Sequence, residues 1–429
     1  MSQLSRPTGT VDYHFPKRCS AAGNRLMHGV NGFGRTLLKN GRWLVGLDAD
    51  DLLERATGIT RLDDFGTPPL REPLNLLLTS FERDADLNLV GRITVRSEML
   101  RLLCNRLRLT HDRKQFPAIA REEILRPIFI TGLPRSGTSF LHALLAQDPG
   151  ARAPQVWEVM HPSPPPLRSS YRSDPRIAAT EKELRWIDVL MPGFDRCHDI
   201  EAQAPQECIA ITDHSFLSYV FESMYFVTSY RKWHDRQDKV PAYLFHKKFL
   251  QQLQCHCPGS HWVLKAPSHL MALDALVQVY PDAEIIMTHR DPLKVLASTA
   301  SFAEVLRAPF TNRSVRRGLG AEVSERWAES ARQAIRFRQS RPKSQNKWCD
   351  VSYLDLVRDP MAVVRGIYHQ FQRELTEEAH GKMLAFLKAQ RTDRNNLHRY
   401  SLEEFGLDPA RERETFRRYM EFFRVVPEG

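Results

Sequence analysis

The first third of the chain carries apolar residues at the spacing of helices. Between about Gly41 and Arg121, leucines and other apolar residues recur three or four positions apart, as in Leu74, Leu77 and Leu78. This spacing matches the 3.6-residue turn of an α-helix, so each segment is expected to bury one face. No residue type in this stretch points to catalysis. We therefore predict a mostly helical N-terminal region over residues 1–126.

The pattern changes at Pro127, where short apolar runs rich in β-branched residues replace the helical period. Such runs, ended by glycine or polar residues, are typical of buried parallel strands. Helical stretches separate them, and this alternation predicts an α/β fold, a P-loop-type parallel sheet flanked by helices, over residues 127–429. The expected strands are Ile128–Thr131, Trp262–Leu264, Glu284–Thr288 and, more weakly, Trp348–Val351, and the expected helices include 139–146, 293–302 and 323–338.

Composition narrows the class of protein. The chain has 429 residues, of which 42% are hydrophobic and 26% charged, which is enough apolar material for a folded core. No apolar run reaches the roughly 18 residues of a membrane span, and the first 20 residues lack the apolar core of a signal peptide. We expect a cytoplasmic protein with its seven cysteines reduced. The formal charge of +10 favours an anionic partner, and nucleic acid, an acidic membrane surface and a phosphorylated small molecule all fit this charge.

A glycine-rich loop follows the first expected strand. Gly132 and Gly137 are five positions apart, as in a P-loop, whose backbone N–H groups and helix N-terminus hold an anion. Thr138 stands where nucleotide-hydrolysing P-loops have a lysine, so the loop suits a 5′-phosphate group better than a triphosphate with magnesium. Arg135 supplies a cation inside the loop, and its guanidinium can hold two phosphate or sulfate oxygens. The alternative is a plain strand-turn-helix in which the glycines only satisfy the backbone.

A second cationic position follows the strand Glu284–Thr288. Arg290 lies where open α/β sheets bind ligands, at the carboxyl end of a strand, and Asp291-Pro292 is a good start for a helix. On that helix Lys294 and Ser298 share one face, so arginine, lysine and serine there could hold a second phosphate. The alternative is that Arg290 pairs with a neighbouring carboxylate.

Together these two motifs resemble the sulfotransferases that use 3′-phosphoadenosine 5′-phosphosulfate (PAPS). The segment 133–139 is similar to the family's 5′-phosphosulfate loop, and Arg290 with Ser298 matches its 3′-phosphate pair in type and spacing. Segments 128–132, 157–166 and 398–407 are similar to the largely bacterial branch with a helical N-terminal extension. The Arg-Lys-Gly loop of the cytosolic eukaryotic members is missing. The resemblance implies PAPS as co-substrate and no metal, with the donor held by Arg135, Ser136, Gly137, Thr138, Ser139, Arg290 and Ser298, and candidates for closing the 3′-phosphate side are Arg391, Arg394 and His398.

Sulfuryl transfer needs cations where charge grows on the leaving oxygens, and a group that takes the acceptor proton. Arg135 can supply the first cation, and Lys265, at the end of an expected strand, can supply another. His269 resembles the family's histidine but lies four residues after the lysine rather than two. Glu158 follows the phosphate loop at nearly the distance at which tyrosine-sulfating relatives place a glutamate. We predict Glu158 as the base ahead of His269, against the alternative that the carboxylate pairs with an arginine and the imidazole caps a helix.

The acceptor is less defined than the donor. The aromatic residues between Phe216 and Phe226 suit core packing, or else an apolar acceptor pocket. We therefore predict sulfuryl transfer to a hydroxyl or amine of a small-molecule, lipid or sugar acceptor, without nucleic acid, with peripheral membrane contact and oligomeric state left open. The alternatives are a P-loop nucleotide kinase or phosphohydrolase, against which Thr138 argues, and a non-catalytic polyanion-binding protein.

Overall fold

The structure is a computed structural model that describes residues 42, 44–190, 201–341, 347–390 and 401–428. Its helices alternate with strands from residue 127 onward, as the hydrophobic pattern predicts. They are α2 (Ala49–Thr60), α3 (Arg71–Arg83), α4 (Leu89–Gln115), α5 (Ala118–Arg121), α6 (Thr138–Leu145), α7 (Val156–Met160), α8 (Pro175–Leu190), α9 (Ile209–Thr212), α10 (Val220–Met224), α11 (Thr228–His234), α12 (Val240–Gln254), α13 (Leu273–Val279), α14 (Pro292–Arg307), α15 (Leu319–Ser340), α16 (Tyr353–Arg358), α17 (Pro360–Gln370), α18 (Glu377–Gln390) and α19 (Pro409–Phe423).

The described residues form a parallel sheet of five strands in the order β2-β3-β1-β4-β5. Four strands coincide with the predicted apolar runs, and the α/β fold class is confirmed. The fifth, β2, is a two-residue edge strand that was not predicted, because so short an element leaves no pattern in the sequence. The strands are β1 (Ile128–Gly132), β2 (Ala151–Arg152), β3 (His261–Lys265), β4 (Glu284–His289) and β5 (Trp348–Ser352).

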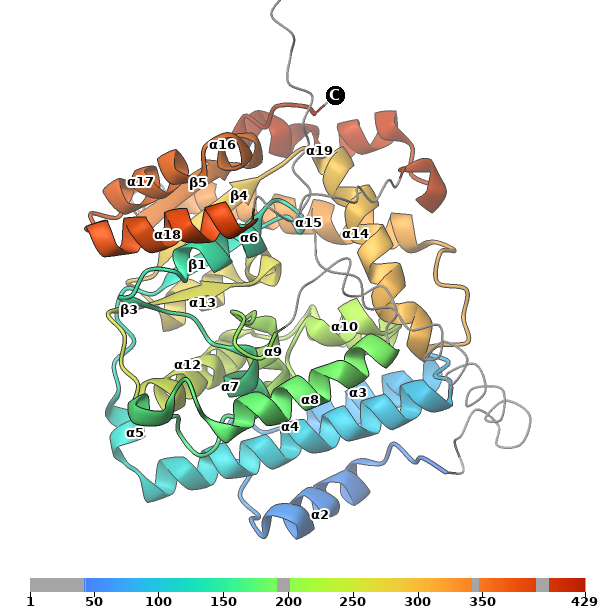
Figure 1. Ribbon diagram of the computed structural model, residues 1–429. Coiled ribbons are helices and arrows are strands. Elements are labelled where there is room, and N and C mark those ends of the chain that lie inside the picture. The colour runs from blue at the N-terminus through green and yellow to red at the C-terminus, as the bar shows by residue number, and fades with distance from the viewer. Residues whose placement is uncertain (1–41, 43, 191–200, 342–346, 391–400, 429) are drawn as a thin grey trace, which may run out of the picture.

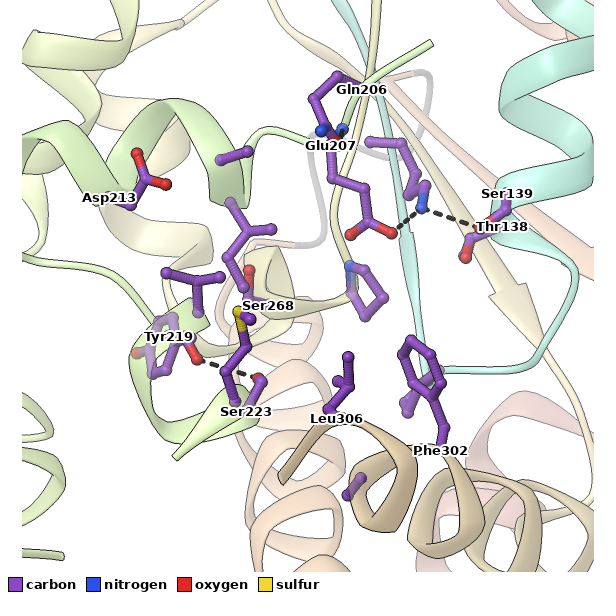
Figure 2. Close-up of a pocket in the computed structure, with 18 of the residues that line it drawn as sticks. Thr138, Ser139, Gln206, Glu207, Asp213, Tyr219, Ser223, Ser268, Phe302 and Leu306 are labelled. Carbon is purple, nitrogen blue, oxygen red and sulfur yellow. Dashed lines mark hydrogen bonds and ion pairs between the residues drawn. The ribbon is translucent and has the colours of Figure 1, made fainter. Parts of the chain in front are cut away.

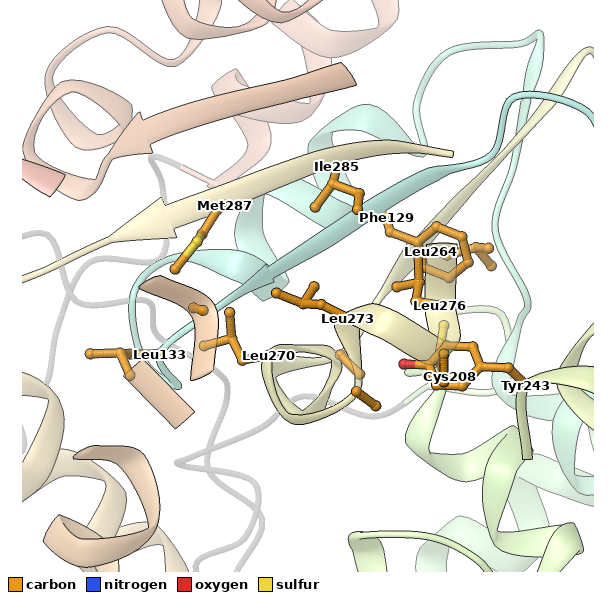
Figure 3. Close-up of a cluster of buried hydrophobic side chains, with 14 of the residues drawn as sticks. Phe129, Leu133, Cys208, Tyr243, Leu264, Leu270, Leu273, Leu276, Ile285 and Met287 are labelled. Atoms are coloured by element: carbon orange, nitrogen blue, oxygen red, sulfur yellow. The ribbon is translucent and has the colours of Figure 1, made fainter. Parts of the chain in front are cut away.

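Strand β1 lies at the centre of the sheet and buries both of its faces. Alternate side chains point to opposite faces, so Ile128 and Ile130 pack with α6, α17 and α18, whereas Phe129 packs with α12 and α13. Figure 3 shows the second cluster, where Phe129 and its neighbours on β3 and β4 meet leucines of the layer below. With both faces covered, the edge that carries the strands' carboxyl ends is where loops can hold ligands.

The N-terminal helices share a core with later parts of the chain. Leucines of α2, α3 and α4 pack in one buried cluster with Phe221 of α10, Tyr230 of α11 and Leu306 at the end of α14. Figure 1 shows α2, α3 and α4 on the side of the molecule opposite α16, α17 and α18. The residues after 127 thus complete the helical core, and the division at residue 126 stays a prediction. Among the described residues no helix is both long and apolar enough to cross a membrane.

Candidate active site

The loop between β1 and α6 has the backbone geometry of an anion-binding turn. Gly132 has φ +146°, and a Cβ there would lie 2.4 Å from the carbonyl oxygen of Thr288 on the neighbouring strand. Gly137, with φ +89°, is the N-cap of α6 and has no side chain to cover the helix N-terminus. Both positions therefore need glycine, and the first N–H groups of α6 face the end of the loop.

Three hydroxyl residues of the loop have different surroundings. Ser136 is buried, donates to the carbonyl oxygen of Leu133 and lies 2.6 Å from the hydroxyl of Thr288, so its side chain holds the loop in shape. Thr138 and Ser139 line a cavity that begins at this loop. Ser139 is exposed there, in a position to contact a bound group.

The second cationic position is brought against the first. Asp291 caps α14 through the N–H of Leu293, as predicted, and this places Arg290 beside the loop. Its Nη1 donates to the carbonyl oxygen of Arg135 at 2.9 Å, while Nε of Arg135 donates to the hydroxyl of Ser298 at 3.0 Å. Arg135 and Arg290 both line the cavity. The structure thus joins two motifs that are about 155 residues apart in the chain.

Arg290 also holds a carboxylate, which was one alternative considered from the sequence. Its Nε lies 3.0 Å from Oε1 of Glu428, and its Nη2 lies 3.2 Å from Oε2. The backbone N–H of Glu428 donates to Asp291 at 2.8 Å. The guanidinium also lies 3.9 Å from the ring centre of Tyr353. The segment that follows α19 is therefore bound directly to the second cationic position.

Lys265 joins the loop to a carboxylate that the sequence did not single out. The lysine ends β3, its side chain is 2% exposed, and its Nζ donates to the hydroxyl of Ser139 at 2.9 Å. The same amine forms an ion pair with Glu207, as Figure 2 shows. Glu207 lines the cavity and is held beside β3 because the N–H of Cys208 donates to the carbonyl oxygen of Lys265. Glu207 is 58 residues from Lys265 in the chain and belongs to no motif, so only the fold reveals it.

The cavity extends from these polar groups along a lining that is mainly apolar but also includes charged side chains of α4, α10, α14 and α15. Its volume is about 1220 Å³. In Figure 2 Glu207 and Ser139 lie at one end of the drawn residues, and Phe302 and Leu306 of α14 lie at the other. The wall also includes Phe221 and Met224 of α10, Tyr225 directly after that helix, and Met99 of α4. Part of the predicted aromatic group therefore lines the cavity while it also packs in the core.

Comparison with known proteins identifies the family. Residues 127–377 match the model of the sulfotransferase family. The chain belongs to that family. This match confirms the resemblance that the two anion-binding motifs predict.

Two solved bacterial structures resemble this sulfotransferase along most of its length. Sulfotransferase STF1 from Mycobacterium tuberculosis H37Rv is 34% identical with a TM-score of 0.76, over 86% of this chain and 98% of its own. Sulfotransferase STF9 from Mycobacterium avium is 29% identical with a TM-score of 0.81, over 89% and 98%. The omega-hydroxy-beta-dihydromenaquinone-9 sulfotransferases Stf3 of Mycobacterium tuberculosis and Mycobacterium bovis are each 25% identical over 256 residues, 56% of this chain and 61% of theirs. The aligned part thus spans less than two thirds of each curated relative.

Glu158, the first candidate for the base of the sulfotransferase, lies away from the cavity. Its side chain is fully buried, forms an ion pair with Arg152 and accepts the N–H of Gln155, which closes a capping box at the start of α7. Arg152 in turn donates to two carbonyl oxygens near the end of α12. This geometry favours the alternative weighed from the sequence, in which the carboxylate pairs with an arginine.

His269, the second candidate, is also buried beneath the site. It lies in the 3-10 helix η5 (Pro267–Met271), and its Nδ1 is 2.5 Å from the hydroxyl of Tyr243. Its ring meets Phe129 edge to face at 5.1 Å. Burial lowers the pKa of His269 to about 3, so the imidazole is neutral at pH 7. Neighbours of His269 in η5, namely Pro267, Ser268 and Met271, line the cavity instead.

The structure tests neither the predicted contacts on the 3′-phosphate side nor the predicted independence of metal. Arg391, Arg394 and His398, proposed for the 3′-phosphate side, lie outside the described residues. Within the described part of the chain, no three His, Cys, Asp or Glu side chains come close enough to hold a metal ion. Metal independence stays a prediction.

Proposed function

We propose that this chain transfers a sulfuryl group from PAPS to the hydroxyl of an apolar acceptor. The observation that carries this proposal is the placement of Lys265, between Ser139 of the phosphate loop and the carboxylate of Glu207. Two groups that could act as a cation for the leaving oxygen and a base for the acceptor proton are thus adjacent in the lining of the cavity.

The two anion-binding motifs fit the two phosphate positions of the donor. The N–H groups at the start of α6, with Arg135 and Ser139, suit the 5′-phosphosulfate, and Arg290 with Ser298 suits the 3′-phosphate. When bound, the donor would supply the sulfuryl group and leave as adenosine 3′,5′-bisphosphate. The chain's own residues would neutralise the charge that grows on the leaving phosphate oxygen.

Glu207 is the base that the geometry supports. Its carboxylate faces the cavity and is 20% exposed, so an acceptor hydroxyl can approach it. As the new S–O bond forms and the old one breaks, the acceptor proton would pass to Glu207 while Lys265 stays protonated beside the leaving oxygen. Because Lys265 and Glu207 are already in contact before the reaction, their side chains need to move little to act as cation and base.

The acceptor class follows from the cavity wall. Apolar side chains from α4, α10 and α14 make up much of the cavity lining, and they suit a hydrocarbon chain or ring system that carries the reacting hydroxyl. The name of the Stf3 relatives gives a hydroxylated menaquinone as their acceptor, which supports a lipid alcohol here.

Two measurements test the proposal. Adenosine 3′,5′-bisphosphate without magnesium should raise the melting temperature, because a ligand that binds only the folded state stabilises it. Stabilisation by ATP with magnesium alone would instead favour a nucleotide kinase or phosphohydrolase.

In assays with labelled PAPS, kcat/KM should rise along a series of alcohols of increasing chain length. Equal values for short and long alcohols would refute the apolar acceptor site.

A further inference from the structure

The carboxylate of Glu428 forms an ion pair with the guanidinium of Arg290, the group that the proposed function assigns to the donor's 3′-phosphate. Nε and Nη2 of Arg290 face the two carboxylate oxygens of Glu428, an arrangement in which each oxygen meets one N–H group. The side chains of Arg290 and Glu428 are only 11% and 7% exposed. Water therefore screens this ion pair less than it screens a surface pair.

A second contact fixes the position of Glu428. Its backbone N–H donates to Asp291 Oδ2 at 2.8 Å, and the other oxygen of Asp291 caps α14. The segment after α19 is thus tied at two points to the residues that start α14. Because Arg290 and Asp291 are adjacent in sequence, Glu428 can contact the two residues at once, through its side chain and through its backbone N–H.

The remaining N–H groups of Arg290 leave little room for a second anion. Nη1 already donates to the carbonyl oxygen of Arg135, and the flat face of the guanidinium lies on the ring of Tyr353. A phosphate that used the Nε and Nη2 edge would also bring its negative charge within a few ångströms of the Glu428 carboxylate. Like charges at that distance repel strongly where water is scarce.

We propose that Glu428 and the 3′-phosphate of the donor compete for Arg290, so that Glu428 sets the affinity for PAPS and for the bisphosphate product. This inference rests on the proposed function. Binding of the donor exchanges one anion for another on the same guanidinium and releases the segment Arg424–Glu428 from the start of α14. Departure of the product reverses the exchange, and Glu428 thereby assists product release.

Calorimetry on single variants tests the competition. Glu428→Gln keeps the size of the side chain and removes its charge. Glu421→Gln is the matched control, because Glu421 is exposed near the end of α19, the helix that precedes Glu428. We expect Glu428→Gln to bind adenosine 3′,5′-bisphosphate about 3- to 10-fold more tightly. Its affinity for adenosine 5′-monophosphate, and both affinities of Glu421→Gln, should match wild type. Unchanged or weaker bisphosphate binding by both Glu428→Gln and Glu428→Ala would overturn the inference.

Limited proteolysis of the wild-type chain gives an independent readout. Arg424 is exposed at the end of α19, so trypsin can cut after it once the following segment leaves Arg290. The bisphosphate should accelerate this cut, as followed by intact mass, and the monophosphate should not. Equal cutting with both ligands would refute the exchange.

The two proposals fail in different ways. If wild type shows no preference for the bisphosphate over the monophosphate, the assignment of Arg290 to a 3′-phosphate is wrong, and the proposed function loses its donor site. If wild type prefers the bisphosphate and Glu428→Gln leaves that preference unchanged, only the competition is wrong.

Discussion

Replacing Glu207 by glutamine tests the proposed base most directly. Glutamine keeps the length of the side chain and an oxygen that can accept from Lys265, but it cannot take up the acceptor proton. General-base catalysis contributes about 10²- to 10⁴-fold, so we expect kcat to fall by that factor. This fall corresponds to about 3–5 kcal/mol of activation free energy.

The effect on folding should be much smaller. Glu207 is 20% exposed, whereas Lys265 is 2% exposed and keeps its contact with Ser139. Loss of the charge on one partner should therefore lower the free energy of unfolding by only about 1–2 kcal/mol. Urea unfolding measures this value separately from catalysis.

Single-turnover rates with saturating PAPS and a long-chain alcohol are the assay for the chemical step. Glu201→Gln is the matched control, because Glu201 also lines the cavity but is exposed, and its rate should stay within about twofold of wild type. If Glu207→Gln retains a rate within threefold of wild type while bisphosphate affinity is unchanged, Glu207 is not the base. The proton would then have to leave through another group.

Further predictions concern the donor, the core and the pH dependence. Arg290→Ala should weaken adenosine 3′,5′-bisphosphate at least tenfold by calorimetry, since a charged hydrogen bond contributes about 2 kcal/mol, and should leave adenosine 5′-monophosphate nearly unaffected. Glu158→Gln should lower the free energy of unfolding by about 3 kcal/mol, because it removes the charge that pairs with a buried arginine. The kcat of the folded fraction should stay close to wild type. A large fall in kcat with unchanged stability would instead indicate that Glu158 is the base. Turnover should survive EDTA, and restoration of lost activity by magnesium alone would contradict this. Burial lowers the pKa values of His246 and His269 to about 3, below the unfolded value of about 6.5, so the unfolded chain binds more protons below that pH. The free energy of unfolding should therefore fall by up to about 1.4 kcal/mol per pH unit for each histidine between pH 6 and 4. When the free energy of unfolding is measured with urea at several pH values, it should depend less steeply on pH in His269→Gln than in wild type.

The phosphate-type loop and the cationic position beside it could be predicted from the sequence because their parts are local; that they bind the donor stays a proposal. Gly132, Gly137 and Arg135 lie within six positions, and Arg290 follows directly after an apolar run that marks its strand. Backbone geometry and helix starts depend on near neighbours, so a short segment carries the signal. Lys265 could be found for the same reason, since it ends a recognisable strand.

The proposed base, Glu207, could not be predicted in the same way. Glu207 reaches Lys265 through a loop that lies beside β3, and such a contact depends on the path of the whole chain. Glu158 stood at a plausible sequence distance, but a buried arginine from the edge strand pairs with it. Spacing in sequence indicates a catalytic role only where the intervening chain is of fixed length and shape. Contacts of Arg391, Arg394 and His398 with the 3′-phosphate stay predictions, because these residues lie outside the described part of the chain.

Helix α14 connects two parts of the molecule that rest on different cores. Its first turns, with Val295 and Leu296, pack on the sheet, whereas its last turn, with Leu306, packs among the N-terminal helices and α10. We therefore expect that substitutions in α4 or α10 can reshape the apolar wall of the cavity without disturbing the packing under the phosphate loop. Mutational effects at the two ends should be nearly additive. If the proposed acceptor site is right, changes confined to the helices around α4 and α10 would alter which acceptor binds and leave the residues proposed for sulfuryl transfer in place.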